Sequence, residues 1–277
     1  MHLISDGMRK QWMVVVFIWW FNTLNAQLTD SLVRRVDLEG TVNFRDMGGY
    51  MNKEGKKIKW KKLFRSDALN KLSGNDTRRL QSYSIKYVFD FRGPAEFKSA
   101  PDILPVGATW VSLPAGSENI GSNDYIKSMQ NPDSFMLAFY GNLKPFKERY
   151  RPFFDTLLVA DTSAAIIFHC TAGKDRTGIA AALLLSALNV DEQLIFEDYL
   201  ATNYYREQEN KRIITVMTSR YNLDKLKAEK LLRADRLYLK ATFDAIKLSY
   251  GSVANYLDKE LGLTKEKLVL LKSRYLE

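Results

Sequence analysis

A thiol and a guanidinium separated by five residues are the groups of this chain best suited to phosphate chemistry. Cys170 is the only cysteine among 277 residues, and Arg176 follows it in the sequence. A thiolate is a strong nucleophile, and the planar arginine fork can hold two oxygens of a phosphoryl group. The two side chains therefore predict attack of Cys170 on a phosphate monoester, with Arg176 binding the phosphoryl oxygens.

The segments on either side of Cys170 are expected to form a cradle for an anion. Residues 164–168 (AAIIF) are typical of a buried strand, and residues 179–188 (IAAALLLSAL) are typical of a buried helix that begins near Thr177. The loop between them then lies at a helix N-terminus, where unpaired N–H groups and the helix dipole favour an anion. The predicted phosphate-binding residues are Thr171, Ala172, Gly173, Lys174, Asp175 and Arg176.

The loop also predicts how Cys170 is activated. Helix N-termini and neighbouring cations lower thiol pKa values from about 8.5 into a range of roughly 3.5–7.5, so a thiolate is expected. Thr177 is expected to give the thiolate a hydrogen bond, Gly173 to allow a tight turn, and His169 to orient the loop from behind. An inert buried cysteine is the alternative, but it explains neither Gly173 nor Arg176.

This loop and three further motifs resemble one family of enzymes. Residues 169–178 (HCTAGKDRTG) resemble the phosphate loop of cysteine-dependent phosphatases. Residues 43–50 (NFRDMGGY), 63–69 (LFRSDAL) and 89–92 (FDFR) resemble successive motifs of the bacterial tyrosine/serine protein phosphatases, which include secreted mycobacterial and listerial enzymes. The resemblance runs from about Val36 to the C-terminus. It implies a phosphomonoester hydrolase, a protein-tyrosine/serine phosphatase of broad specificity that forms a phosphocysteine intermediate without a cofactor or metal ion.

Two aspartates compete as the general acid that protonates the leaving oxygen and then activates water. Asp90 lies at the end of a predicted strand, in an Asp-Phe-Arg motif that resembles the family's acid-bearing segment, whereas Asp175 precedes Arg176 in the loop. Asp90 is preferred, because a donor on a separate element can face the leaving group while the loop holds the phosphate. Asp175 is still assigned to the site, and Arg92 with Glu96 is expected to support Asp90.

Lys174 bears on the choice of substrate. Its place in the loop resembles that of the lysine in inositol-lipid phosphatases, where an extra cation meets a second phosphate. Two substrates therefore stay open: phosphorylated proteins and, as the alternative for an exported enzyme, inositol phosphates or phosphoinositides. Intact Cys170 and Arg176 disfavour a catalytically dead phosphate-binding module. The lack of other cysteines disfavours an arsenate reductase, whose thiol relay needs them.

The remaining pattern predicts an α/β protein, and the resemblance implies the cysteine-phosphatase fold, with a central, mainly parallel sheet flanked by helices. Residues 85–91 and 108–113 are predicted strands that end at Gly-Pro and Pro. Residues 114–131, rich in Gly, Ser and Asn, are expected to form a loop. Residues 134–159 are predicted to be helical, with breaks near the prolines at positions 145 and 152. The region of about 190–249 predicts helices; in the resembled family such helices include a lid over the active site, and a plain C-terminal helical cap agrees equally well with the pattern.

Residues 1–26 are predicted to be a secretory signal peptide. A basic pair precedes a ten-residue apolar run at 12–21, and Ala26 offers a cleavage point. The run is shorter than the roughly 17–25 residues of a membrane helix, yet an uncleaved N-terminal anchor stays open as the alternative. The protein is therefore expected to be exported, periplasmic or secreted, with residues 27–277 as a single phosphatase catalytic domain.

The composition agrees with a globular enzyme but does not identify its partner. Hydrophobic residues make up 46% of the chain and charged residues 26%, which is enough to bury a core in one domain. The formal net charge of +9 favours anionic substrates or surfaces, and a solvated basic exterior explains it equally well. No nucleic-acid partner is predicted, and contact with a membrane is compatible with the sequence but not required.

Overall fold

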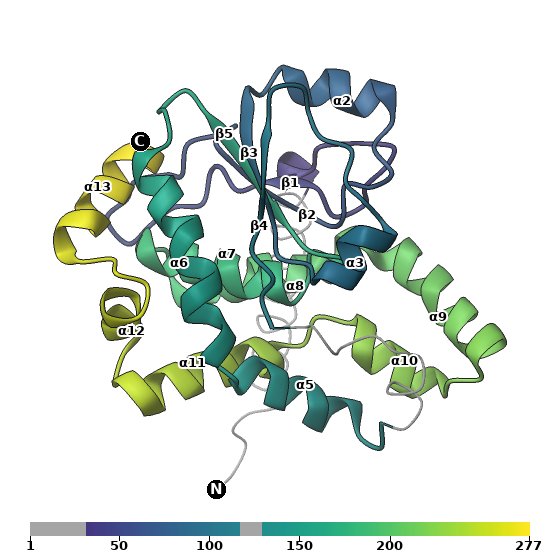
Figure 1. The fold of residues 1–277 in the computed structure, drawn as a ribbon. Helices are drawn as coiled ribbons and strands as arrows, with labels where there is room; N and C mark the ends of the chain where they lie inside the picture. The colour runs from purple at the N-terminus through teal and green to yellow at the C-terminus, as the bar shows by residue number, and fades with distance from the viewer. Residues whose placement is uncertain (1–31, 117–128) are drawn as a thin grey trace, which may run out of the picture. The chain divides into compact units, whose positions relative to one another are not determined.

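A computed structural model of the chain describes residues 32–116 and 129–277 (Figure 1). The predicted signal peptide lies outside these residues, as does most of the loop predicted at 114–131. The chain divides into two units, residues 1–35 and 36–277, and the fold below is that of the second unit. Among the described residues, no helix is both long enough and apolar enough to cross a membrane.

A five-stranded sheet forms the centre of residues 36–277. Its strands are β1 (Arg45–Asp46), β2 (Leu63–Ser66), β3 (Ile85–Asp90), β4 (Thr109–Ser112) and β5 (Ala165–His169), in the spatial order β1-β2-β5-β3-β4. The last four run parallel to their neighbours, and β1 pairs antiparallel with β2. The predicted, mainly parallel sheet is confirmed, and the three predicted strands agree with β3, β4 and β5 to within one residue at each end.

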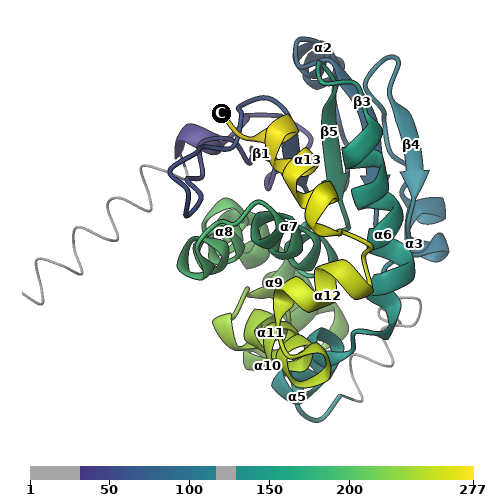
Figure 2. The same cartoon turned by 90° about the vertical axis from the view of Figure 1, so that its left-hand side faces the viewer.

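Helices flank this sheet, and a further group of helices lies below it (Figures 1 and 2). They are α2 (Gly74–Gln81), α3 (Pro94–Ser99), α5 (Pro132–Gly141), α6 (Lys144–Val159), α7 (Arg176–Ala187), α8 (Glu192–Tyr205), α9 (Glu207–Tyr221), α10 (Lys225–Leu232), α11 (Arg236–Tyr250), α12 (Val253–Lys259) and α13 (Lys265–Tyr275). The region of about 190–249 is therefore helical, as predicted, and consists mainly of α8 to α11.

Alternate side chains of β5 enter two separate cores. Ile166 and Phe168 join the larger core, to which α6 and α7 contribute, whereas Ala165 and Ile167 join a smaller core that includes Leu80 of α2. Successive side chains of a strand point to opposite faces of the sheet, so helices cover both faces of β5. Burial on both faces explains why the sequence of β5 is apolar without alternation.

The predicted break between two helices is confirmed near position 145, and the second predicted break is wrong. Pro145 lies in the first turn of α6, where its missing N–H removes no helical hydrogen bond. Pro152 lies inside α6, which continues through it to Val159. Phe153 and Leu157 are fully buried against the sheet, and this packing holds the helix together across the proline.

Candidate active site

Three parallel strands end at one edge of the sheet and bring the sequence motifs together. β2 ends at Ser66, β3 at Asp90 and β5 at His169, and the strand register pairs His169 with both of the other two residues. The carboxyl ends of parallel strands form the usual site for ligands in open α/β sheets. The Cys170 loop therefore lies between the segments that follow β2 and β3.

The loop that follows β5 turns its carbonyl groups away from its own centre. Three successive carbonyls accept hydrogen bonds from neighbouring segments: Thr171 from the Ala68 N–H (3.2 Å), Ala172 from Asn43 Nδ2 (2.9 Å) and Gly173 from Arg65 Nη2 (2.8 Å). None of the backbone N–H groups of residues 171–175 donates to a backbone acceptor in the part of the chain that the structure describes. These donors stay available to an anion held inside the loop.

Gly173 makes the tight loop possible. Its φ angle is +65°, and a Cβ atom at this position would lie 2.3 Å from the carbonyl oxygen of Ser66. A left-handed backbone and a contact this close both require glycine. The end of β2 therefore packs directly on the backbone of the loop.

Cys170 lies at the base of the loop and is 2% exposed. Thr177, in the first turn of α7, is buried, and its Oγ1 atom has no hydrogen-bond partner among the described residues. A buried hydroxyl without a partner is costly, and the hydrogen bond expected from Thr177 to the thiolate stays a prediction. The hydroxyl of Tyr150 donates to the carbonyl of Arg176 at 2.7 Å and fixes the same turn.

Glu96 of α3 binds Arg176 through both carboxylate oxygens. Nη1 and Nη2 of Arg176 donate to Glu96 at 2.6 and 2.9 Å, and Nη1 also donates to the carbonyl of Phe91 at 3.2 Å. Burial would raise the pKa of Glu96, but hydrogen bonds from Arg176 and Thr171 together with the charge of Arg176 lower it to about 2. Glu96 therefore stays ionised and holds Arg176 at the loop.

Asp175 presents a partly exposed carboxylate at the N-cap of α7. Its Oδ1 atom accepts a hydrogen bond from the Tyr140 hydroxyl of α5 at 2.7 Å, and the Lys174 ammonium lies 3.4 Å from the same oxygen. The side chain is 25% exposed. Tyr140 is itself fixed by a 2.8 Å hydrogen bond to the hydroxyl of Tyr199. Asp175 is thus oriented by a rigid partner and still reaches solvent.

The sequence of residues 36–277 matches the family model described as "Tyrosine phosphatase family". The chain belongs to the tyrosine phosphatase family. It is 34% identical to a protein of Cupriavidus necator named "Putative tyrosine-protein phosphatase H16_A0669" over 223 residues, which cover 78% of this chain and 80% of that one. It is 26% identical to the triple specificity protein phosphatase PtpB of Mycobacterium tuberculosis over 269 residues, with coverage of 83% and 94%.

A solved structure of TpbA from P. aeruginosa in complex with phosphotyrosine covers 68% of the chain and 89% of that protein, at 16% identity and a TM-score of 0.30. A TM-score this low supports no argument about the site. The sequence relationships carry the assignment: this tyrosine phosphatase is a phosphoric monoester hydrolase, and its family is the one that the four motifs resemble.

The surroundings of Asp90 argue against this residue as the general acid, the role that the sequence analysis prefers for it. Asp90 is fully buried, and its carboxylate accepts hydrogen bonds from Nε and Nη2 of Arg92 at 2.8–3.1 Å. Trp110 Nε1 approaches the same carboxylate at 3.4 Å. A carboxylate that is enclosed and paired in this way cannot meet a leaving group. Arg92 does support Asp90, as expected, but Glu96 pairs with Arg176 instead.

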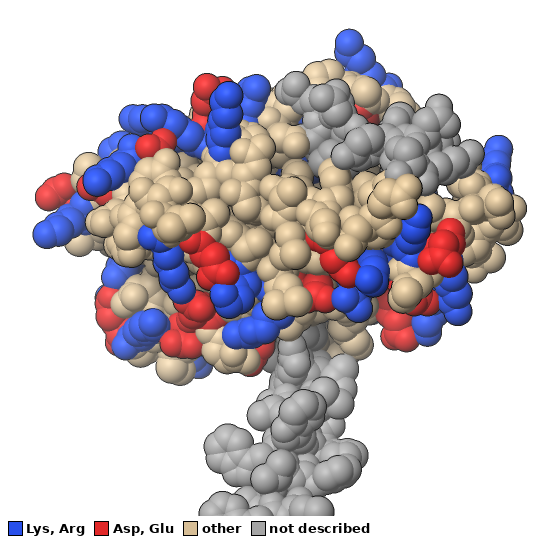
Figure 3. All heavy atoms as spheres, turned by 90° about the horizontal axis from the view of Figure 1, so that it is seen from below, with Lys and Arg blue, Asp and Glu red and all other residues tan. Residues whose placement is uncertain are grey.

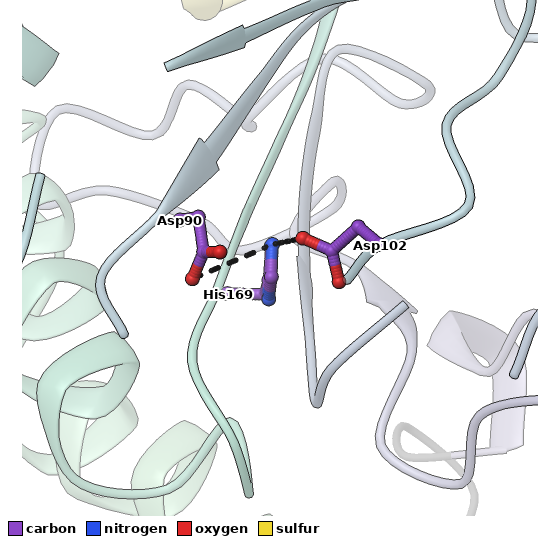
Figure 4. A group of neighbouring side chains, drawn as sticks. All are labelled: Asp90, Asp102 and His169. Atoms are coloured by element: carbon purple, nitrogen blue, oxygen red, sulfur yellow. Dashed lines mark ion pairs between the residues drawn. The ribbon is translucent and has the colours of Figure 1, made fainter. Parts of the chain in front are cut away.

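The side chains of Asp90, Asp102 and His169, the residue before Cys170, form a buried group (Figure 4). Their ligand atoms lie within 4.8 Å of one another, and these residue types can hold a metal ion. Arg92 Nη2, however, lies 2.8 Å from an oxygen of each aspartate. The guanidinium already supplies the positive charge between the two carboxylates, so the residues do not fit a metal site.

Lys174 points away from the cradle, contrary to its expected role as a phosphate ligand. The side chain is 2% exposed, and Nζ donates to the carbonyls of Leu231 and Arg233 at 2.5 and 3.0 Å. Burial lowers its pKa, and the charge of Asp175 opposes that shift. The ammonium therefore joins the loop to the end of α10 and is not free to meet a second phosphate.

A cavity of about 450 Å³ opens beside Thr171 and Glu96. Its other walls come from residues 39–42, from 67–71 and from α9. The charged residues that line it are of both signs: Glu39, Asp67, Glu96 and Glu209 against Lys71, Arg92 and Arg206. The face shown in Figure 3 also carries charges of both signs, with Lys and Arg among Asp and Glu.

Sequence reasoning missed the roles of Glu96, Tyr140 and Asn43 at this site. Glu96 lies in the first turn of α3, and it binds Arg176 rather than supporting Asp90 together with Arg92, as the sequence predicts. Tyr140 lies 35 residues before Asp175 in a helix with no local link to the loop. Asn43 lies in the motif at residues 43–50. That motif is the signal that could have pointed to the contact between the Asn43 amide and the loop.

Proposed function

We propose that this phosphatase removes phosphate from phosphotyrosine and phosphoserine of proteins, through a phosphocysteine intermediate on Cys170. The observation that carries the proposal is the outward orientation of the loop carbonyls, which leaves the backbone N–H groups of residues 171–175 without backbone acceptors among the described residues. Phosphate monoesters carry negative charge on three peripheral oxygens, and converging N–H donors suit that charge in the ground state and the transition state.

In the first step the Cys170 thiolate attacks phosphorus, so that an S–P bond forms as the P–O bond to the substrate breaks. The leaving oxygen takes a proton from Asp175, which replaces Asp90 in this role. Two observations support this assignment. The Asp175 carboxylate is partly exposed, and its Oδ1 atom accepts a hydrogen bond from Tyr140 that orients the side chain. Arg176, held by Glu96, stabilises the charge on the transferred phosphoryl group.

In the second step the Asp175 carboxylate takes a proton from a water molecule, whose oxygen attacks phosphorus. The S–P bond breaks, inorganic phosphate leaves, and the thiolate forms again. Thr177 supports this step, because its unpartnered hydroxyl can donate to the sulfur as charge returns to it. No residue beyond those of the loop, Glu96 and Tyr140 is needed for either step.

The surroundings of the loop favour a polypeptide substrate over a multiply phosphorylated one. A ligand with several phosphates needs an excess of cations, whereas the adjoining cavity has charges of both signs and Lys174 is bound to carbonyl groups. The name of the Mycobacterium tuberculosis relative, a triple specificity protein phosphatase, supports a broad choice of phosphorylated side chains.

A panel of substrates tests the proposal. Purified enzyme is assayed with a phosphotyrosine peptide, a phosphoserine peptide of the same sequence, an inositol polyphosphate and a phosphoinositide in vesicles. Cys170→Ser serves as the matched control for contaminating phosphatases. We expect both peptides to be hydrolysed with kcat/KM values above those for either inositol substrate. A higher kcat/KM on an inositol substrate would replace this proposal with an inositol phosphatase.

A further inference from the structure

Lys174 is a buried cation of the catalytic loop to which the proposed mechanism gives no role. Its ammonium group faces three oxygen atoms: the carbonyl oxygens of Leu231 and Arg233, at 2.5 and 3.0 Å, and Oδ1 of Asp175, at 3.4 Å. A lysine ammonium has three N–H donors and no acceptor. The donors therefore match the oxygens around them, and no N–H of Lys174 is left for a phosphate.

The same oxygen of Asp175 has a second donor, the hydroxyl of Tyr140, which lies 2.7 Å from Oδ1. Burial and the charge of Asp175 raise the pKa of Tyr140 well above its usual value, so this hydroxyl keeps its proton. The Tyr199 hydroxyl lies 2.8 Å from that of Tyr140. Because the single proton of Tyr140 goes to Asp175, Tyr199 is the donor in this second contact. Oδ1 thus lies between a buried hydroxyl and a buried ammonium.

The other carboxylate oxygen, Oδ2, accepts no hydrogen bond from the part of the chain that the structure describes. Asp175 is the N-cap residue of α7, and an aspartate at this position usually accepts a hydrogen bond from an N–H group of the first helical turn. Its side chain makes no such bond. The carboxylate therefore turns to Tyr140 and Lys174 instead of the helix end, and only Oδ1 is held.

The two donors at Oδ1 determine which oxygen carries the proton when Asp175 is in its acid form. A proton on Oδ1 would face the Tyr140 hydroxyl and the Lys174 ammonium at the same time, and a buried donor that loses its acceptor is costly. A proton on Oδ2 keeps both contacts. The acid form therefore carries its proton on the oxygen that has no protein partner among the described residues.

We propose that Lys174, together with Tyr140, is a positioning residue for the general acid: the two donors hold Oδ1 of Asp175 and leave the proton on Oδ2. Lys174 also joins this arrangement to the end of α10, which packs on α5, the helix of Tyr140 (Figures 1 and 2). The proposal rests on the role of Asp175 proposed above, and it gives Lys174 a function other than phosphate binding.

The position of the carboxylate gives a test that does not depend on activity. In the double variant Tyr140→Phe/Lys174→Met, both donors to Oδ1 are absent, and an aspartate at an N-cap then favours the N–H groups of the first helical turn. We expect a crystal structure of this variant to show the Asp175 side chain turned to those groups of α7. A carboxylate that stays in its original position overturns the proposal, whatever Asp175 does in catalysis.

The leaving group gives the second test. For Lys174→Met and for Tyr140→Phe, we expect kcat/KM on a phosphoserine peptide to fall about tenfold more than on para-nitrophenyl phosphate, because a misplaced acid matters most for a basic leaving group. The affinity for vanadate should stay within about twofold of the wild-type value. Lys174→Met also removes the donor to two carbonyl groups, so its melting temperature should fall. Tyr140→Phe leaves those groups paired and tests the same oxygen.

Two variants away from the loop are the matched controls. Tyr238→Phe removes another buried tyrosine hydroxyl that donates to a carboxylate, that of Asp133. Lys240→Met removes an exposed ammonium that pairs with Asp244 on α11. Neither change should alter the ratio of the two kcat/KM values.

A double-mutant cycle with Asp175→Asn separates the outcomes. In that background Lys174→Met should not change the ratio further, because the acid is absent. Equal losses on both substrates in Lys174→Met would make this lysine a structural residue only, and a loss of vanadate affinity would make it a phosphate ligand; either result overturns the proposal. An even loss in Asp175→Asn itself would instead overturn the proposed general acid, and the crystal structure of the double variant still decides what holds the carboxylate.

Discussion

Replacing Asp175 by asparagine removes the proton that the proposed mechanism gives to the leaving oxygen. The Oδ1 atom of asparagine can accept the same hydrogen bond from the Tyr140 hydroxyl, 2.7 Å away. The change also removes the negative charge 3.4 Å from the buried Lys174 ammonium, so a loss of stability is expected as well. The dependence of the rate loss on the leaving group therefore reports the proton transfer.

The size of the effect depends on the leaving group. A positioned general acid contributes about 10²–10⁴ to the rate, or about 2.7–5.5 kcal/mol of barrier. The serine alkoxide is a strong base and needs the proton, whereas para-nitrophenolate leaves readily without it. For Asp175→Asn we expect kcat/KM to fall at least about 100-fold on a phosphoserine peptide and less than about tenfold on para-nitrophenyl phosphate.

Asp90→Asn is the matched control, because it makes the same chemical change at the other candidate. It breaks a fully buried pair with Arg92, so it should cost about 3–5 kcal/mol of stability and lower both rates by a similar factor. The assay is the ratio of the two kcat/KM values at several pH values for each variant. A leaving-group-dependent loss in Asp90→Asn but not in Asp175→Asn would refute the assignment.

Three further outcomes follow from the geometry of the loop. Cys170→Ser should abolish turnover and keep vanadate binding, and a residual kcat above about a tenth contradicts the nucleophile. Gly173→Ala places a Cβ 2.3 Å from the Ser66 carbonyl oxygen, so titration calorimetry should show that the variant no longer binds vanadate. Binding with the wild-type affinity would contradict the role of the loop as the anion site. The pKa of Glu96 is lowered from 4.5 to about 2. Its pairing with Arg176 therefore stabilises the folded state by at most about 3 kcal/mol above about pH 4.5. This contribution disappears as the pH falls toward 2. Urea midpoints of Glu96→Gln should therefore vary less with pH across that window, and identical slopes contradict the pairing.

The loop could be predicted from the sequence because its chemistry is local. Cys170 and Arg176 are joined by one turn between a strand and a helix, and the apolar runs on both sides mark those elements without reference to the rest of the fold. The parallel strands could be predicted for the same reason. Their apolar runs are continuous, and turn residues end them.

The proposed assignment of Asp175, rather than Asp90, as the general acid could not be predicted, because it depends on which way side chains turn in three dimensions. Asp90 lies at the end of a strand next to the Cys170 loop, as predicted, but Arg92, two residues later, donates hydrogen bonds to its carboxylate. Asp175 is oriented by Tyr140, from a helix that packs against the loop only in the folded protein. The role of Lys174 could not be predicted for the same reason. Its ammonium donates to a carbonyl of α10, and no pattern near position 174 indicates that contact.

Asp198 explains how two of the sequence motifs, at residues 43–50 and 63–69, act on the site without touching substrate. Arg45 and Arg65, from β1 and β2, both bind the Asp198 carboxylate of α8, and all three side chains are buried. Two arginines and one aspartate carry a net charge of +1, and Arg65 also donates to the outward carbonyl of Gly173. Charges interact strongly where water is excluded, so this excess positive charge favours an anion on the inner side of the same peptide. The trio is thus better compensated when the loop holds a phosphoryl group than when it is empty, and part of the cost of burying two guanidinium groups is recovered on binding.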